Sequence, residues 1–172
     1  MKTLLATEKA KQRVMWVALL MILFVGVFVF QKSKSASIQS NYSSEKKSEW
    51  ASLLSDEGTV YLHWLRTLNP IVSKTDGDLI WNTHQQKGLM RFVNLPELKN
   101  GQYYRLWVYD LQLSTEKPVS AAVFMGSKDK QEFYTDILPE KPLSQPFKFL
   151  LTVGAKGDES FSHSQSLLLA QP

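Results

Sequence analysis

The chain has 172 residues, no cysteine and a formal net charge of +4. The lack of cysteine in this sequence excludes disulfides, thiolate chemistry and cysteine-based zinc sites. The basic excess belongs to residues 1–49, with eight Lys or Arg against three Asp or Glu, whereas residues 50–172 have twelve against thirteen. Nucleic acid is therefore not expected as a partner of the C-terminal part.

The stretch from residue 14 to residue 30 contains no charge and no proline. As a helix it would be about 26 Å long, at ~1.5 Å per residue. This length approaches a hydrocarbon core of roughly 30 Å, and Arg13 and Lys32 can extend their charged groups to the two interfaces. We predict that residues 14–30 form a single transmembrane helix in the lipid bilayer.

A cleaved secretory signal is the alternative interpretation of this run. A basic segment precedes it, and Ser35, Ala36 and Ser37 offer small residues to a peptidase. The apolar core of a signal peptide is usually about 7–15 residues long, and this run is longer. The membrane anchor is therefore favoured.

The flanking segments predict the orientation of the anchor. Residues 1–13 are short and basic, and we expect them to be a cytoplasmic N-terminus too small to form a folded domain. Residues 31–49 are rich in Ser and Lys, which predicts a flexible linker. The expected location is the bacterial inner (plasma) membrane, with one pass and an extracytoplasmic C-terminal domain.

Residues 50–172 have the pattern of an all-β domain. After one short helical turn at residues 50–58, runs rich in β-branched and aromatic residues alternate with turn residues. The expected strands cover residues 59–68, 79–81, 89–93, 102–111, 119–125, 133–137, 147–153 and 165–170. Short strands at this spacing, without a convincing helix, predict an antiparallel, immunoglobulin-like β-sandwich. A β-barrel is the alternative.

The sequence contains little that points to catalysis. The three histidines, His63, His84 and His163, have no second ligand at metal-binding spacing on the same element. Asp76 and Asp78 share a turn but lack the other ligands of a calcium loop. We therefore expect no enzyme activity, no metal site and no cofactor.

The most informative stretch is Gln102 to Leu111. Strand alternation places Tyr104, Leu106 and Val108 on one face. Four candidate binding residues lie on the other face: Tyr103, Arg105, Trp107 and Tyr109. A guanidinium among aromatic rings suits cation–π and stacking contacts with a protein or a glycan. The alternative, which is favoured, is that these rings line the sandwich interior or lie beneath a loop.

Several short segments resemble the outer domain of the anti-sigma-K factor family. The match runs through the segment 88–96, continues into the Tyr104–Trp107 strand and includes closing strands at 149–153 and 167–170. The residues that carry the family motif are Leu95, Pro96, Gly101, Tyr104, Leu106 and Trp107. The resemblance covers about residues 50–170.

This resemblance implies a single-pass membrane regulator of transcription. Members of the family hold a sigma factor through a cytoplasmic domain, while the outer domain senses an envelope signal and gates proteolysis of the anchor. Residues 1–13 are too few for such a sigma-binding domain, so we expect this chain to act with a sigma or anti-sigma protein or another membrane protein. The alternative function is a periplasmic interaction module for envelope assembly or glycan binding.

Overall fold

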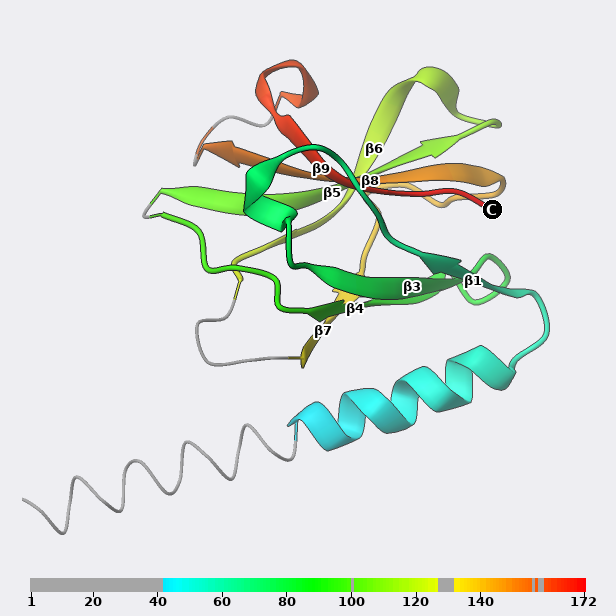
Figure 1. The fold of residues 1–172 in the computed structure, drawn as a ribbon. Coiled ribbons are helices and arrows are strands. Elements are labelled where there is room, and N and C mark those ends of the chain that lie inside the picture. Colours follow the sequence, from blue (N-terminus) through cyan, green and yellow to red (C-terminus); the bar gives the residue numbers. More distant parts are fainter. Residues whose placement is uncertain (1–41, 100, 127–131, 156, 158–159) are drawn as a thin grey trace, which may run out of the picture. The chain divides into compact units, whose positions relative to one another are not determined.

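The computed structural model describes residues 42–172, apart from residues 100, 127–131, 156 and 158–159 (Figure 1). The chain divides into two units, residues 1–45 and residues 46–172. The expected cytoplasmic segment, membrane span and first part of the linker lie outside the described residues. Among the residues that are described, no helix combines the length and apolar character needed to cross a membrane.

The second unit is built mainly from β-strands. In the described part of the chain these are β1 (Thr59–His63), β2 (Leu65–Arg66), β3 (Asp76–Asn82), β4 (Lys87–Val93), β5 (Gln102–Asp110), β6 (Ser114–Phe124), β7 (Glu132–Ile137), β8 (Pro146–Ala155) and β9 (Gln165–Ala170). Two short 3-10 helices, η1 (Pro70–Val72) and η2 (Phe161–His163), lie between strands. An α-helix over residues 42–55 precedes β1.

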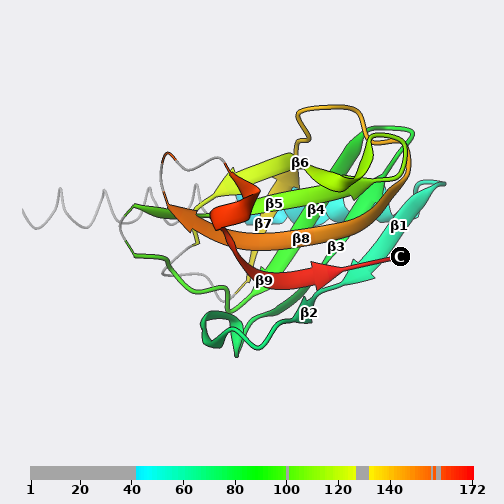
Figure 2. The same ribbon diagram turned by 90° about the horizontal axis from the view of Figure 1, so that it is seen from above.

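The strands form two antiparallel sheets, as Figure 2 shows. One sheet has the order β1-β3-β4-β7 and the other the order β2-β9-β8-β5-β6. The predicted all-β, two-sheet class is confirmed. The immunoglobulin-like order is not found, because such a domain groups its strands A, B, E and D against C, F and G.

The two sheets are connected along both sides. At one side the chain crosses from β1, which pairs with β3, to β2, which pairs with β9, within the few residues around Trp64. At the other side, the Leu138 N–H donates to the Ala121 carbonyl oxygen at 2.6 Å and the Glu140 N–H donates to the Ser120 carbonyl oxygen at 3.0 Å. These links partly close the sandwich along its sides, which is a feature of the alternative fold, a β-barrel.

The main core lies between the sheets. Alternation along each strand directs one set of side chains inward, including Leu79 and Trp81 of β3 and Tyr104 and Leu106 of β5. Phe92 stacks on Trp64 with ring centroids 5.7 Å apart and interplanar angle 12°. Large rings from both sheets thus fill the interior, as the aromatic content of the strands predicts.

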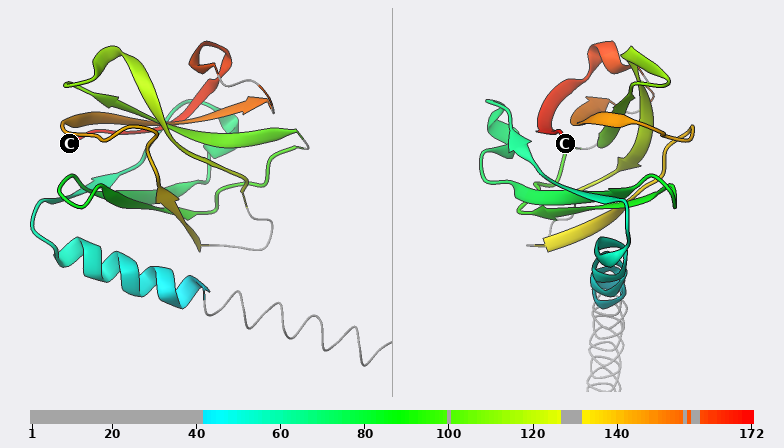
Figure 3. Two further views of the ribbon diagram at one scale, coloured as in Figure 1. Left: turned by 180° about the vertical axis from the view of Figure 1, so that it is seen from behind. Right: turned by 90° about the vertical axis from the view of Figure 1, so that its right-hand side faces the viewer.

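The linker prediction is wrong from residue 42 onward. Residues 42–55 are helical, and residues 46–55 belong to the same unit as the β-strands. Figure 3 shows residues 46–55 of this helix beside the four-stranded sheet, on the face turned away from the five-stranded sheet. Leu53, Ile80 and Leu89 form a buried cluster there. Polar composition suggested a flexible segment, but a few apolar side chains at helical spacing are enough to dock it.

A close backbone approach predicts the effect of adding a methyl group at Gly77. This residue has φ +144°, and a Cβ would lie 2.1 Å from the Arg91 carbonyl oxygen. We expect Gly77→Ala to lower the free energy of unfolding by roughly 2–4 kcal/mol in a urea titration. Gly154→Ala is the control, since its Cβ would meet nothing within 4 Å. Equal stability of the two variants would contradict the described pairing of β3 with β4.

Candidate functional site

The four predicted binding residues lie together on the outer face of the five-stranded sheet, and we call this surface the β5 face. The guanidinium carbon of Arg105 lies 5.5 Å from the Tyr103 ring centroid and 5.2 Å from that of Trp107. The ammonium group of Lys148 lies 4.0 Å from the Tyr109 ring centroid. Alternating cations and rings of this kind attract one another through the ring quadrupole.

The short helix η2 covers much of the β5 face. Ser160 caps η2 by accepting a hydrogen bond from the Ser162 N–H at 3.3 Å. The Phe161 ring centroid lies 5.5 Å from that of Trp107 and 6.1 Å from that of Tyr109. The rings therefore lie beneath a covering segment, as one of the sequence interpretations predicts, and not inside the sandwich.

Little of the β5 face is exposed. Trp107 and Tyr109 are each 6% exposed and Arg105 is 9% exposed. The Trp107 Nε1–H donates to Thr152 Oγ1 at 3.1 Å, and Leu150 packs in the same cluster. Burial also raises the pKa of the Tyr109 hydroxyl. The cluster is therefore a second, smaller core on the outside of the sheet.

The family-motif residues mainly hold the connection between β4 and β5. Leu95, Tyr104 and Leu106 are buried in the main core. The Tyr104 hydroxyl donates to the Pro96 carbonyl oxygen at 2.8 Å, and burial raises its pKa. Gly101 has φ +81°, a conformation that favours glycine, just before β5 begins. These residues guide the chain from one sheet to the other.

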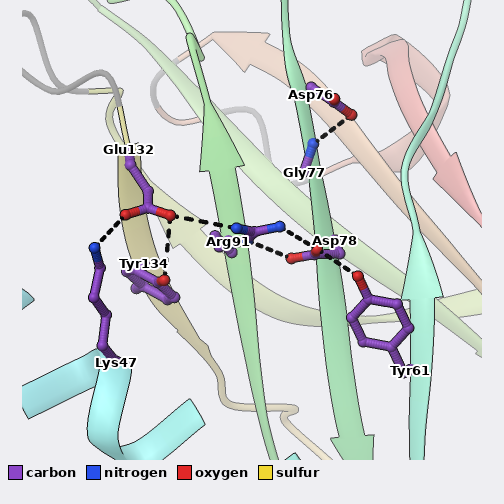
Figure 4. Close-up of polar contacts among 8 residues, drawn as sticks. All are labelled: Lys47, Tyr61, Asp76, Gly77, Asp78, Arg91, Glu132 and Tyr134. Carbon is purple, nitrogen blue, oxygen red and sulfur yellow. Dashed lines mark hydrogen bonds and ion pairs between the residues drawn. The ribbon is translucent and has the colours of Figure 1, made fainter. Parts of the chain in front are cut away.

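The outer face of the four-stranded sheet has a chain of charged contacts, which Figure 4 shows. Asp78 is 1% exposed. Its carboxylate accepts from Arg91 Nε at 2.7 Å and Nη2, and from the Tyr61 hydroxyl at 2.7 Å. Arg91 Nη1 also lies 3.4 Å from Glu132 Oε1. Lys47 Nζ completes the chain at 2.7 Å from Glu132 Oε2.

Further ion pairs connect the helix to the sheet. Lys46 Nζ lies 2.6 Å from Asp136 Oδ1 and 2.7 Å from Glu49 Oε2. Lys87 Nζ lies 2.8 Å from Glu49 Oε1. The helix therefore presents charges of both signs to partners on β4 and β7.

The apolar side of the same helix packs on strand side chains. The Trp50 ring centroid lies 6.5 Å from that of Tyr61 and 5.8 Å from that of Tyr134. Leu53 is 3% exposed and packs with Ile80 and Leu89. We call the sheet surface under the helix the helix seat; it comprises Tyr61, Ile80, Leu89, Glu132, Tyr134 and Asp136.

The ion pairs alter the pKa values of the groups around the seat. Hydrogen bonding from Lys47, with a further contribution from Arg91, lowers the pKa of Glu132 below 4.5. Burial alone would raise the pKa of Glu49, but hydrogen bonds from Lys46 and Lys87 outweigh it and lower the value. Both carboxyls therefore contribute stability that is present above about pH 4.5 and is lost as the pH falls through their lowered pKa values.

Sequence reasoning missed the helix seat, although a signal was present. Lys46, Trp50 and Leu53 follow the i, i+4, i+7 spacing of one helix face. The seat itself combines residues from four strands, which no local pattern brings together.

The histidines lie in separate places: His63 lies on β1 and His84 lies beside Gly58. No three His, Cys, Asp or Glu side chains among the described residues gather to hold a metal ion.

Because the Asp78 carboxylate is buried, we expect replacement of Arg91 to lower the free energy of unfolding strongly. Arg91→Met leaves the Asp78 charge buried with only the Tyr61 hydroxyl, and should cost about 3 kcal/mol in free energy of unfolding. Adding Asp78→Asn removes that charge and should recover about 1 kcal/mol or more, measured by urea titration at pH 7. Lys47→Met, at an exposed member of the network, is the control and should change stability little. A double variant no more stable than Arg91→Met would contradict this account.

Because Trp107 is covered, we expect the free energy of unfolding to fall more when more of its side chain is removed. Trp107→Ala removes the ring under Phe161 and should lower the free energy of unfolding by about 3 kcal/mol. Trp107→Phe keeps an aromatic ring but loses the bond to Thr152, and should cost about 1 kcal/mol. Chemical denaturation followed by circular dichroism measures both. An unchanged stability of Trp107→Ala would show that the ring does not hold a core.

Comparison with known proteins gives a family match over most of the chain. Residues 14–162 match the family described as "Anti-sigma-K factor rskA, C-terminal". Searches of the curated proteins and of the solved structures returned no match. The matched range contains the predicted membrane run, the helix, both sheets up to β8, and η2 as far as Ser162. The chain therefore belongs to the family of anti-sigma-K factor C-terminal domains.

Proposed function

We propose that the chain is a membrane-anchored regulatory protein of the anti-sigma type. Residues 14–30 span the bacterial plasma membrane once, and the β domain lies outside the cytoplasm. The domain controls sigma factor activity through protein–protein contacts, in concert with a sigma or anti-sigma protein. The observation that carries this proposal is the family match, which begins at residue 14 and so includes the apolar run together with the β domain.

The composition of the apolar run supports the membrane part of this proposal. It has no charged residue between Arg13 and Lys32, and a helix of this length approaches the thickness of the hydrocarbon core. The helix at residues 42–55 follows in the sequence and is docked by its residues 46–55 on the four-stranded sheet. In the sequence, this helix therefore lies between the proposed anchor and the β-strands.

The β5 face gives weaker support to a second role, the binding of a glycan or of another protein. Its rings and guanidinium suit stacking on a glycan or a protein. However, Trp107 and Tyr109 are each only 6% exposed under Phe161. A ligand would contact little of these rings unless η2 moved. Because the rings and guanidinium suit such ligands but are mostly covered, binding of a glycan or of envelope assembly proteins at this face is only the second candidate function.

The membrane anchor is tested by extraction and protease access. In bacterial cells the full chain should stay in the membrane fraction after carbonate washing, and protease added to spheroplasts should digest the β domain. The control, Leu20→Arg with Leu23→Arg, should weaken insertion, because each charge at the centre of a span costs about 3 kcal/mol. Extraction of the wild-type chain by carbonate would contradict the anchor.

The regulatory role is tested by identifying partners in the same cells. Photo-cross-linking from exposed positions of the full chain, followed by mass spectrometry, should recover a sigma factor or an anti-sigma protein. The Trp107→Phe variant should recover the same partner, since the ring lies under η2. Recovery of envelope polymers or assembly proteins instead would favour the second candidate function over regulation.

A further inference from the structure

The helix seat combines an apolar floor with an acidic rim. Ile80 and Leu89 from the two central strands form the floor with Leu53 of the helix. Glu132 and Asp136 from β7 pair with the adjacent lysines, Lys47 and Lys46. Tyr61 and Tyr134 flank the floor and contact Trp50 edge-on. This surface is complementary to a short helix with two lysines followed by a tryptophan and a leucine.

The seat is separate from the core that holds the two sheets together. The floor residues Ile80 and Leu89 belong to a small cluster with Leu53 and Trp50. Their neighbours along the strands, Leu79 and Met90, point to the opposite side and belong to the main core. Removing the helix would expose the small cluster and leave the packing between the sheets intact.

When the helix is absent, Asp136 loses its ion pair with Lys46, but its side chain is 36% exposed and water can solvate it. The other two carboxylates at the seat or beside it, Glu132 and Asp78, keep partners. Asp78 retains the two Arg91 bonds and the Tyr61 hydroxyl. Glu132 retains contacts to Arg91 and to the Tyr134 hydroxyl, each at 3.4 Å. No buried carboxylate among these is left without a counter-charge or a donor. The usual penalty for breaking a buried ion pair therefore does not oppose departure of the helix.

The connection between helix and strand provides a pivot. Gly58 has φ +81°, and the Asn82 side chain holds this turn through the Glu57 carbonyl oxygen at 3.1 Å. The turn thus stays attached to β3, whereas the helix before it is held by its side chains and by one hydrogen bond from Thr59 Oγ1 to the Leu53 carbonyl oxygen at 2.7 Å. Lys47 is exposed, and ion pairs of exposed lysines contribute little individually.

We propose that the helix seat is a recognition surface for an amphipathic helix that carries two adjacent lysines. Residues 46–55 occupy it within the same chain, and a helix of a second protein with adjacent lysines, then an aromatic residue and a leucine three positions apart, displaces them. The seat accepts such a partner because its acidic rim and apolar floor match this pattern. This inference does not depend on a role in sigma factor regulation.

Hydrogen exchange of the full chain in detergent tests release of the helix. The variant Lys46→Glu with Lys47→Glu should exchange the amides of residues 48–55 at least tenfold faster, while β5 and β8 stay protected. Lys99→Glu with Lys117→Glu makes the same charge change at exposed positions and should leave exchange unchanged. Unchanged exchange of the helix, or loss of protection in β5 and β8 along with it, would overturn the proposal.

A labelled peptide of residues 42–55 tests the vacated seat. Fluorescence anisotropy should show at least tenfold tighter binding to the charge-reversed full chain than to the wild type, whose own helix competes. A peptide with both lysines changed to Glu and Trp50 changed to Ala should bind neither protein. If the charge-reversed chain released its helix but bound no peptide, the seat would not be a recognition surface. Failure of the sigma-factor cross-linking would not affect this result.

Discussion

The side chains of β3 and β4 are buried on both faces of the four-stranded sheet, and this double burial determines much of the structure. One face, with Leu79 and Met90, packs against the other sheet. The other face, with Ile80 and Leu89, would lie in water without the helix. Exposed apolar surface is unfavourable by about 25 cal/mol per Å², so a covering element is required. The helix supplies this cover and places its lysines against Glu132 and Asp136.

The strands were largely predictable because their signals are local. Alternation in Gln102–Asp110 identified both faces of β5, and the turn at Gly101 marked its start. Pairing was not predictable, since β4 pairs with β7 about forty residues later and β8 lies between β5 and β9. Only the end of the helix was predicted, as one turn within residues 50–58. The rest was missed because charged and serine residues dominate its composition, whereas Trp50 and Leu53 acquire their role only against the sheet.

The candidate site illustrates the same limit. Strand parity brought Tyr103, Arg105 and Trp107 together, as the structure describes. It did not reveal that Phe161, within a polar serine-rich stretch, covers them. The motif residues around Leu95 and Tyr104 proved to hold the path of the chain between sheets. These motif residues stabilise the fold, so the motif indicates the domain better than it indicates a binding surface.

The account depends on helix 46–55 being docked on the sheet in the intact protein. Nuclear Overhauser contacts in the full chain in detergent micelles test this most directly. Protons of the Trp50 indole should show contacts to the rings of both Tyr61 and Tyr134, whose centroids lie 6.5 and 5.8 Å away. A helical segment without contacts to either tyrosine would contradict the docked arrangement and the helix seat inferred from it.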